Sequence, residues 1–177
     1  MPFFSNLDDT SAVPDIVAMT PEFRDAMGPY NRAILESPSE LERGQREMIA
    51  AYVSGLNGCS YCYGVHTATS AAFGIEESVF KALMSDLESA PVDEKMKPLL
   101  RLARRLTLEP AKTVQADIDA ITAAGWKEKT AHDAILVICM FNFMNRMLDG
   151  HGVKGDAAIH RARADALLGR ASPDEPI

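Results

Sequence analysis

Several features are scarce or missing in this sequence. Aromatic residues make up only 7% of the chain although 47% of it is hydrophobic, so the apolar content is mainly Ala, Leu, Met and Ile, which suit helices better than twisted sheets. No segment alternates like a strand, and no low-complexity tract or clear repeat is present. We therefore expect an all-α fold: one helical domain over residues 1–177, with an N-terminal arm at 1–13 and a disordered tail at 170–177.

Positive charge is also in deficit. The formal net charge is −7, and the resulting negative field repels phosphate backbones and anionic lipid surfaces. The first ten residues have neither the basic region nor the long apolar run of a secretory signal, and no stretch is long and apolar enough to cross a bilayer. We expect a cytoplasmic protein with no nucleic-acid partner and no membrane partner.

Cysteines are few: the chain has three. This small, odd number is not that of a disulfide-stapled secreted domain. In a reducing compartment, a CxxC pair is more often catalytic or metal-binding than structural. The pair in NGCSYCYGVH, residues 57–66, is therefore the first candidate for a functional site.

Apolar spacing, glycines and prolines predict a series of helices. The clearest start signal is SPSE, where Ser37 is a candidate N-cap, Pro38 the first helical residue and Glu40 the capping-box partner. The segment at 130–152 is apolar around most of its circumference, which indicates a helix buried in the core or in a subunit interface. The predicted helices are 21–36 (kinked or restarted at 28–29), 38–55, 59–73, 76–87, a helix carrying the apolar residues of 96–106, one from about 114 that ends at 125, 130–152 and 157–168.

The CxxC motif falls at the start of a predicted helix. Unpaired N–H groups and the helix dipole stabilise a thiolate there, so such thiols ionise more readily than a free cysteine. Cys62 and His66 are one turn apart on the same helix face, and the imidazole leans back toward the thiol. Cys59 lies about two turns from His66, so direct proton transfer favours the pair of Cys62 and His66.

A carboxylate from the preceding helix is placed near this histidine. If the chain reverses at Asn57, then Glu47 and Thr67 are equally far from the turn, and Glu47 is level with His66 across an antiparallel helix pair. Glu47, His66 and the two thiols would form a proton relay. Oxidation of one thiol by a peroxide gives a sulfenic acid, which the other can condense with to form a disulfide.

Other interpretations of the same residues remain open. Cys59, Cys62, His66 and Glu47 could bind Zn²⁺, although structural zinc usually takes four ligands and the sequence has no second CxxC. The cysteines could be small buried hydrophobes. A redox sensor or disulfide adaptor, oxidised once to change the binding of a partner, is a further alternative. We interpret Cys139 as a core residue, and Asn142 and Asn145 as hydrogen-bonding groups in a stripe that continues to Asp149.

A family resemblance rests on two segments. REMIAAYVSGLNGCSYCYGVH (46–66) resembles the signature of the alkyl hydroperoxidase D-like (AhpD-like) proteins of the carboxymuconolactone decarboxylase superfamily. MFNFMNRMLDGHGV (140–153) is similar to the later helix of the peroxidase-related branch. Tyr61 stands where the best-studied hydroperoxidase branch has a histidine. The decarboxylase branch lacks the CxxC, so lactone decarboxylation is not favoured.

The resemblance implies an all-helical homo-oligomer with the CxxC near a subunit contact. It implies a thiol peroxidase that reduces hydrogen peroxide or organic hydroperoxides in antioxidant defence. Cys62 then attacks the peroxide, Cys59 resolves it, and Glu47 and His66 form the proton relay. We expect no haem, flavin or metal cofactor, and an external dithiol or thioredoxin-like protein as reductant.

Overall fold

The computed structural model describes residues 1–169, and the expected disordered tail at 170–177 lies outside them. The described residues contain helices and no strands, which confirms the all-α prediction for this part of the chain. The α-helices are α1 (Val13–Ala18), α2 (Pro21–Leu35), α3 (Arg43–Leu56), α4 (Ser60–Ala71), α5 (Glu77–Ser85), α6 (Lys97–Leu108), α7 (Gln115–Ala123), α8 (Glu128–His151) and α9 (Ala157–Gly169), with 3₁₀ turns η1 (Glu94–Met96) and η2 (Pro110–Lys112).

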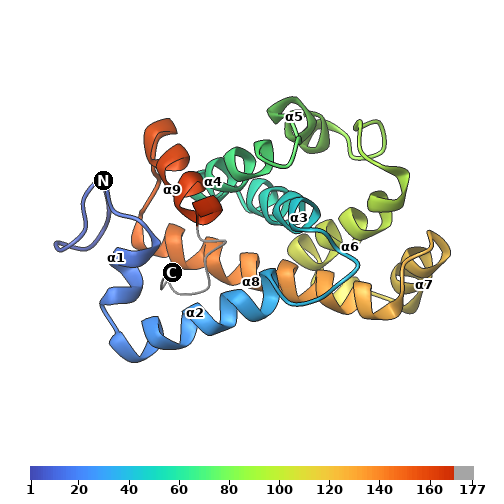
Figure 1. Ribbon diagram of the computed structural model, residues 1–177, viewed down its shortest axis with the longest axis horizontal. Coiled ribbons are helices and arrows are strands. Elements are labelled where there is room, and N and C mark those ends of the chain that lie inside the picture. The colour runs from blue at the N-terminus through green and yellow to red at the C-terminus, as the bar shows by residue number, and fades with distance from the viewer. Residues whose placement is uncertain (170–177) are drawn as a thin grey trace.

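Helix α3 lies at the centre of the bundle (Figure 1). It packs against α4, α6 and α8, while α9 packs on α4 from the other side. Ile49, Leu99 and Ile138, from α3, α6 and α8, are fully buried where these helices meet. Because α3 supplies small residues such as Ala50 and Ala51 to this core, its neighbours can approach its backbone closely.

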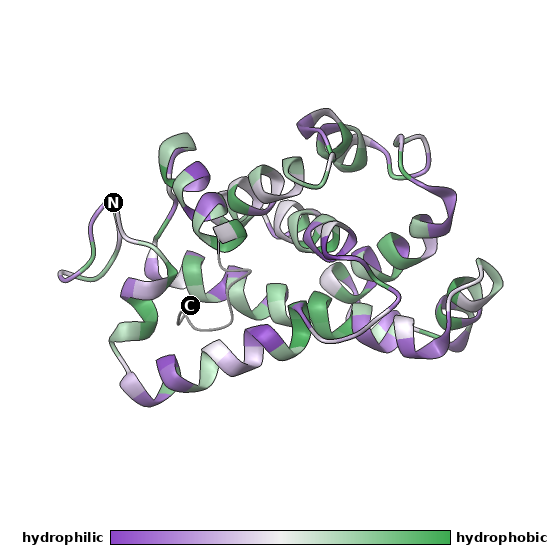
Figure 2. Ribbon diagram, viewed as in Figure 1, coloured by the Kyte–Doolittle hydropathy of each residue, from purple (hydrophilic) through white to green (hydrophobic). Residues whose placement is uncertain are grey.

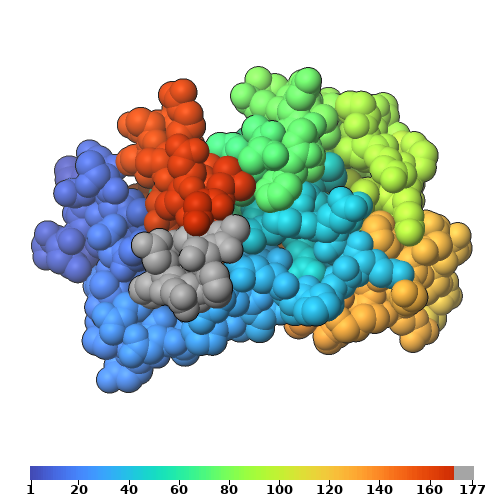
Figure 3. Space-filling view, in the orientation of Figure 1, coloured from blue at the N-terminus to red at the C-terminus, as the bar shows by residue number. Residues whose placement is uncertain are grey.

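Most helices are amphipathic, as their apolar spacing predicted. Hydrophobic and hydrophilic residues alternate along the same ribbons and are not confined to separate helices (Figure 2). No helix of residues 1–169 is long and apolar enough to span a membrane. The space-filling view shows α9, in red, at the surface between the blue N-terminal residues and the green region around α5 (Figure 3).

The predicted helix start at Ser37 and Pro38 is wrong. Helix α3 begins at Arg43, and the Gln45 side chain accepts a hydrogen bond from the Glu42 N–H at 3.0 Å. The residues that resembled a cap serve α8 instead, as Glu40 accepts hydrogen bonds from the Lys127 N–H and the Thr130 hydroxyl. A tertiary contact therefore outweighs the local capping signal, because the start of α8 also has N–H groups that need acceptors.

The structure narrows one further expectation and corrects another. Helix α2 is continuous through Pro29, so of the predicted kink or restart the restart is excluded. Cys139 is exposed and is not a core residue, because α8 presents Leu136, Cys139 and Phe143 outward along one face. An apolar run alone cannot distinguish a helix buried on all sides from one with an exposed apolar stripe.

Residues 1–12 contain no helix. They are nevertheless attached to the bundle, because Leu7 and Ala12 are buried and the Phe3 N–H donates to the carbonyl of His151 at 3.0 Å. The N-terminal segment therefore closes the end of α8.

Candidate functional site

The turn between α3 and α4 positions the CxxC motif. Gly58 has a φ of 73°, which is in the left-handed region that glycine adopts without strain. The Cys59 N–H donates to the Ser54 carbonyl at 3.0 Å, and Cys59 is the N-cap of α4. This confirms the prediction that the motif opens a helix. Cys62 then lies in the first turn, where backbone N–H groups lack helical acceptors.

The two thiols are free, buried and electrostatically coupled. Hydrogen bonds from the Cys62 side chain and N–H lower the pKa of Cys59, although burial opposes them. The pKa of Cys62 is raised, chiefly because its thiol is the donor to Cys59 and also because it is buried. Of the two sulfurs, Cys59 is therefore the one that loses its proton more readily, and Cys62 is the one that retains it.

A network of amides from α8 lies against the thiols. Asn145 donates to the Ser54 hydroxyl at 2.9 Å and accepts from Asn57 at 2.8 Å, and Asn57 also donates to Asn142 at 3.1 Å. A hydrogen bond from Asn145 opposes the rise in the pKa of Cys62. The predicted role of the asparagines as hydrogen-bonding groups is confirmed, and Asn145 reaches the site as well.

A carboxylate on α8 also faces the motif. Asp149 raises the pKa of both Cys59 and Cys62, and its Oδ1 lies 3.5 Å from the Lys154 ammonium. The sequence interpretation assigned Asp149 no function. The signal was present in the stripe of polar residues that it shares with Asn142 and Asn145.

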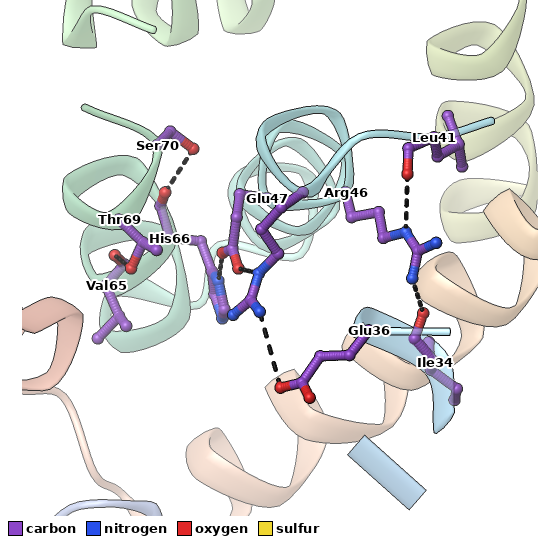
Figure 4. A network of polar contacts seen from close by, with 10 residues as sticks. Ile34, Glu36, Leu41, Arg46, Glu47, Val65, His66, Thr69 and Ser70 are labelled. Carbon is purple, nitrogen blue, oxygen red and sulfur yellow. Dashed lines mark hydrogen bonds and ion pairs between the residues drawn. The ribbon is translucent and has the colours of Figure 1, made fainter. Parts of the chain in front are cut away.

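The second part of the site is a buried ionic array between α3 and α4 (Figure 4). The Nδ1 atom of His66 lies 2.6 Å from Oε2 of Glu47, and the Arg43 Nε donates to Oε1 of Glu47 at 2.7 Å. Glu47 is 0% exposed, and the His66 ring packs edge-on against Phe141 with ring centroids 4.4 Å apart. The expected position of Glu47 level with His66 across the helix pair is confirmed.

The charges of this array outweigh the cost of burying a carboxylate. Burial alone raises the pKa of Glu47, but the charges and hydrogen bonds of His66 and Arg43 lower it below its usual value. Glu47 therefore remains ionised. Because Glu47 occupies Nδ1 of His66, the other ring nitrogen, Nε2, is the one that remains for proton exchange.

The two parts of the site occupy successive turns of α4. The hydrogen bond that the structure gives the His66 ring goes to Glu47, whereas the polar contacts of the Cys62 thiol go to Cys59 and Asn145. Direct contact between His66 and Cys62, which the helical spacing predicted, is therefore not among the interactions of residues 1–169. Proton transfer between them needs an intervening group or a small movement.

This separation also bears on the zinc hypothesis. Within residues 1–169, no three His, Cys, Asp or Glu side chains come together in an arrangement that could hold a metal ion. His66 and Glu47 satisfy each other, and the thiols form their own pair. The donor set that the sequence suggested for zinc does not assemble in this part of the chain.

A surface hollow of about 280 Å³ leads to the motif. It lies where α3 meets the start of α4, and α5 forms its outer wall. Its lining residues are Ser54, Gly55, Gly58, Cys59, Ser60, Tyr63 and Met84. This hollow gives a small molecule a route toward the thiol pair.

These features define a class: an all-helical protein with a buried dithiol at a helix start and an adjacent Glu–His pair. Residues 21–105 match the model of the carboxymuconolactone decarboxylase family. This part of the chain is therefore a carboxymuconolactone decarboxylase family domain, and the solved structures similar to the chain include AhpD-like peroxidase-related proteins.

Two solved structures show this likeness most fully. A peroxidase-related protein from Silicibacter sp. TM1040 is 26% identical, with a TM-score of 0.77 over 84% of this chain and 78% of that one. An AhpD-core peroxidase-related protein from Ralstonia eutropha JMP134 is 21% identical, with a TM-score of 0.76 over 90% of this chain and 96% of that one. The second likeness shows the AhpD-like fold alone.

Two other relatives widen the comparison. An uncharacterised protein of Bacillus subtilis (strain 168), YdfG, is 29% identical over 62% of this chain and 74% of its own length. A debrominase solved in complex with 2,3,4-tribromopyrrole is 18% identical, with a TM-score of 0.69 over 85% of this chain and 79% of that one. The fold therefore supports more than one chemistry.

Proposed function

We propose that this protein is a thiol peroxidase-like oxidoreductase that reduces hydrogen peroxide or organic hydroperoxides in antioxidant defence. The observation that carries the proposal is the pair of free, coupled thiols of Cys59 and Cys62 in the first turn of α4, one turn from the buried pair of Glu47 and His66. The peroxidase-related proteins of the same fold support it.

The cycle begins with the loss of one proton from the thiol pair. When the proton that remains lies on Cys59, the Cys62 thiolate attacks the O–O bond of the hydroperoxide, forms Cys62–SOH and releases an alkoxide that takes a proton to become an alcohol. The Cys59 sulfur then attacks the sulfenic acid, a disulfide forms and water leaves. The substrate gains the two electrons that the thiol pair loses.

Glu47 and His66 handle protons in this scheme. The carboxylate fixes the tautomer and orientation of the ring, so that His66 Nε2 can exchange protons with the thiols or the leaving alkoxide across the short gap between them. The disulfide is then reopened by an external dithiol or a thioredoxin-like protein through thiol exchange, which suits a reducing compartment such as the cytoplasm. The chemistry uses the chain's own sulfurs.

The proposal includes assembly into a homo-oligomer. On α8, Leu136 and Phe143 are 36% and 43% exposed, and Tyr30 of α2 is 41% exposed. Exposed apolar and aromatic side chains of this kind favour burial against another chain. We expect light scattering after gel filtration to give a mass above that of one chain, and Phe143→Glu to lower it.

The experiment that tests the function is an intact-mass measurement on reduced protein, before and after one equivalent of an organic hydroperoxide. The expected result is the loss of two hydrogens, mapped to a disulfide between Cys59 and Cys62, with Cys139 still free. No change at either cysteine would contradict the proposal. Repeated turnover with a dithiol reductant separates an enzyme from a sensor that is oxidised once.

Three variants test the roles within the cycle. In Cys59→Ser, a sulfenic-acid trap should label Cys62, and labelling only of Cys59 in Cys62→Ser would reverse the order of the sulfurs. His66→Ala should slow peroxide consumption and shift its pH profile. An unchanged profile would remove His66 from the relay.

A further inference from the structure

A second hollow of about 280 Å³ lies beside the one that leads to Cys59. It is formed by α3, the end of α5 with the loop that follows, and α6, and the side chains used below are Tyr52, Met84, Asp86, Glu88, Arg101 and Arg104. Met84 lines both hollows. The two hollows are therefore adjacent, and Met84 lies at their boundary.

The phenol of Tyr52 lies next to Arg104 in this hollow. The residue is 1% exposed, and its hydroxyl is buried with no close hydrogen-bond partner in residues 1–169. Burial raises the pKa of Tyr52, and the nearby Arg104 guanidinium opposes that rise. Because buried hydroxyl groups nearly always have a partner, a phenol without a close one, next to an arginine that lines the same cavity, points to a ligand acceptor between the two.

Two carboxylates and two guanidinium groups line the hollow, and one of the arginines has no carboxylate partner. Arg101 is bound by both oxygens of Glu88, at 2.7 and 2.5 Å, and Asp86 accepts from the Glu88 N–H at 3.1 Å. Arg104 has no carboxylate partner in the described part of the chain, and its guanidinium lies next to the Tyr52 phenol. A guanidinium and a phenol O–H that converge on one cavity are donors suited to a carboxylate.

Resting on the proposed function, we propose that Arg104 and Tyr52 bind the carboxylate of an acidic organic hydroperoxide whose apolar body passes Met84 into the hollow at Cys59. Met84 suits this position because its unbranched thioether can change conformation, and 39% of its surface is exposed. Its sulfur lies close over α3, 2.6 Å from where a Cβ on Gly55 would stand. A side chain at Gly55 would therefore obstruct the passage.

The test compares two substrates in the same protein: cumene hydroperoxide, which is neutral, and a fatty-acid hydroperoxide, which carries a carboxylate. Arg104→Gln should raise KM for the acidic substrate by roughly tenfold and leave cumene hydroperoxide unchanged. Tyr52→Phe should raise KM for the acidic substrate by roughly threefold. Equal effects on both substrates, or no effect on the acidic one, would overturn the proposal.

A matched control separates local binding from net charge. Arg105→Gln removes the same charge from the next residue of α6, whose guanidinium faces Asp117 at 3.7 Å and lies outside the hollow. The acidic substrate should keep its KM in this variant. If Arg105→Gln acts as strongly as Arg104→Gln, the effect is long-range electrostatics and the carboxylate site is excluded.

A binding measurement keeps the inference independent of turnover. Octanoate has the carboxylate and apolar tail but no peroxide, and calorimetry should show that it binds the wild type and loses roughly tenfold in affinity in Arg104→Gln. Inorganic phosphate that competes as strongly as octanoate, or no octanoate binding, would overturn the inference. If octanoate binds as expected while neither hydroperoxide is consumed, the proposed function fails and the carboxylate site stands.

Discussion

The two ends of the reactive face of α4 have opposite electrostatic environments. At the N-terminal end, the two thiols of Cys59 and Cys62 interact with each other, the Asn145 amide stabilises the Cys62 thiolate, and the Asp149 carboxylate raises the pKa of both thiols. One turn further on, His66 contacts the ionised and fully buried Glu47, which Arg43 holds from the other side. Helical spacing alone places the thiols and His66 on one face of α4. Their acidity depends on the partners that α3 and α8 place beside them.

Removal of a thiol should have the largest effect on this comparison. Cys62→Ser should abolish peroxide consumption, because an alcohol neither forms a sulfenic acid nor closes a disulfide. A coupled peroxide-consumption assay measures this, with circular dichroism to show that the bundle is retained. Normal turnover in Cys62→Ser would show that the thiol end of α4 is not reactive.

Disruption of the ionic end should mainly affect stability. Glu47→Gln leaves Arg43 and His66 without their shared carboxylate and should lower the free energy of unfolding by about 3 kcal/mol, measured by urea denaturation. Glu36→Gln is the matched control, because Glu36 is half exposed and lies 3.8 Å from the same arginine. It should change the free energy by about 0.5 kcal/mol or less. Equal losses in the two variants would contradict the special role of the buried carboxylate.

The amide network should matter at the thiol end. Asn145→Ala removes the hydrogen bonds of Asn145 with Ser54 and Asn57 and should cost about 1–3 kcal/mol of unfolding free energy. It should also raise the pKa of Cys62, because the hydrogen bond from Asn145 stabilises the thiolate. Thiolate absorbance against pH measures this shift. A lowered pKa would mean that Asn145 does not act as a donor to the sulfur.

The pH dependence of stability should separate the ionic end from the rest of the protein. The pKa of Glu47 is lower in the folded protein than its ordinary value of 4.5. Its contribution is therefore complete above pH 4.5 and is lost as the pH falls below that value through the folded pKa. Urea midpoints of Glu47→Gln should depend less on pH below 4.5 than those of the wild type. Parallel curves would show that Glu47 has no such shift.

Cys139 gives the smallest expected effect and an internal control for the other cysteines. It is exposed on α8 and outside the site, so Cys139→Ser should change the unfolding free energy by about 0.5 kcal/mol or less and leave peroxide consumption intact. Urea denaturation and the peroxide assay measure both. A large loss of activity would place the reactive sulfur outside the CxxC motif.

Local sequence patterns predicted most of the helices and the register of the site. Gly58 and Gly74 mark the ends of helical runs, and the equal distance of Glu47 and Thr67 from the turn placed Glu47 beside His66. These features depend on the helical period and on the short loop between α3 and α4, which the sequence specifies directly. The predicted helix start at Ser37 was wrong because Glu40, the expected capping-box partner, instead binds the start of α8, which is distant in the sequence.

The sequence by itself determined that this protein is a helical bundle with a CxxC at the start of a helix and a carboxylate level with His66. Only the tertiary structure decided that Glu47 is fully buried between His66 and Arg43, that Asn145 and Asp149 reach the thiols, and that Cys139 faces outward. The physical reason is the distance along the chain over which each effect acts. Helical period and turn residues act over a few positions, whereas partners from α8 are fixed by packing between residues far apart in the chain.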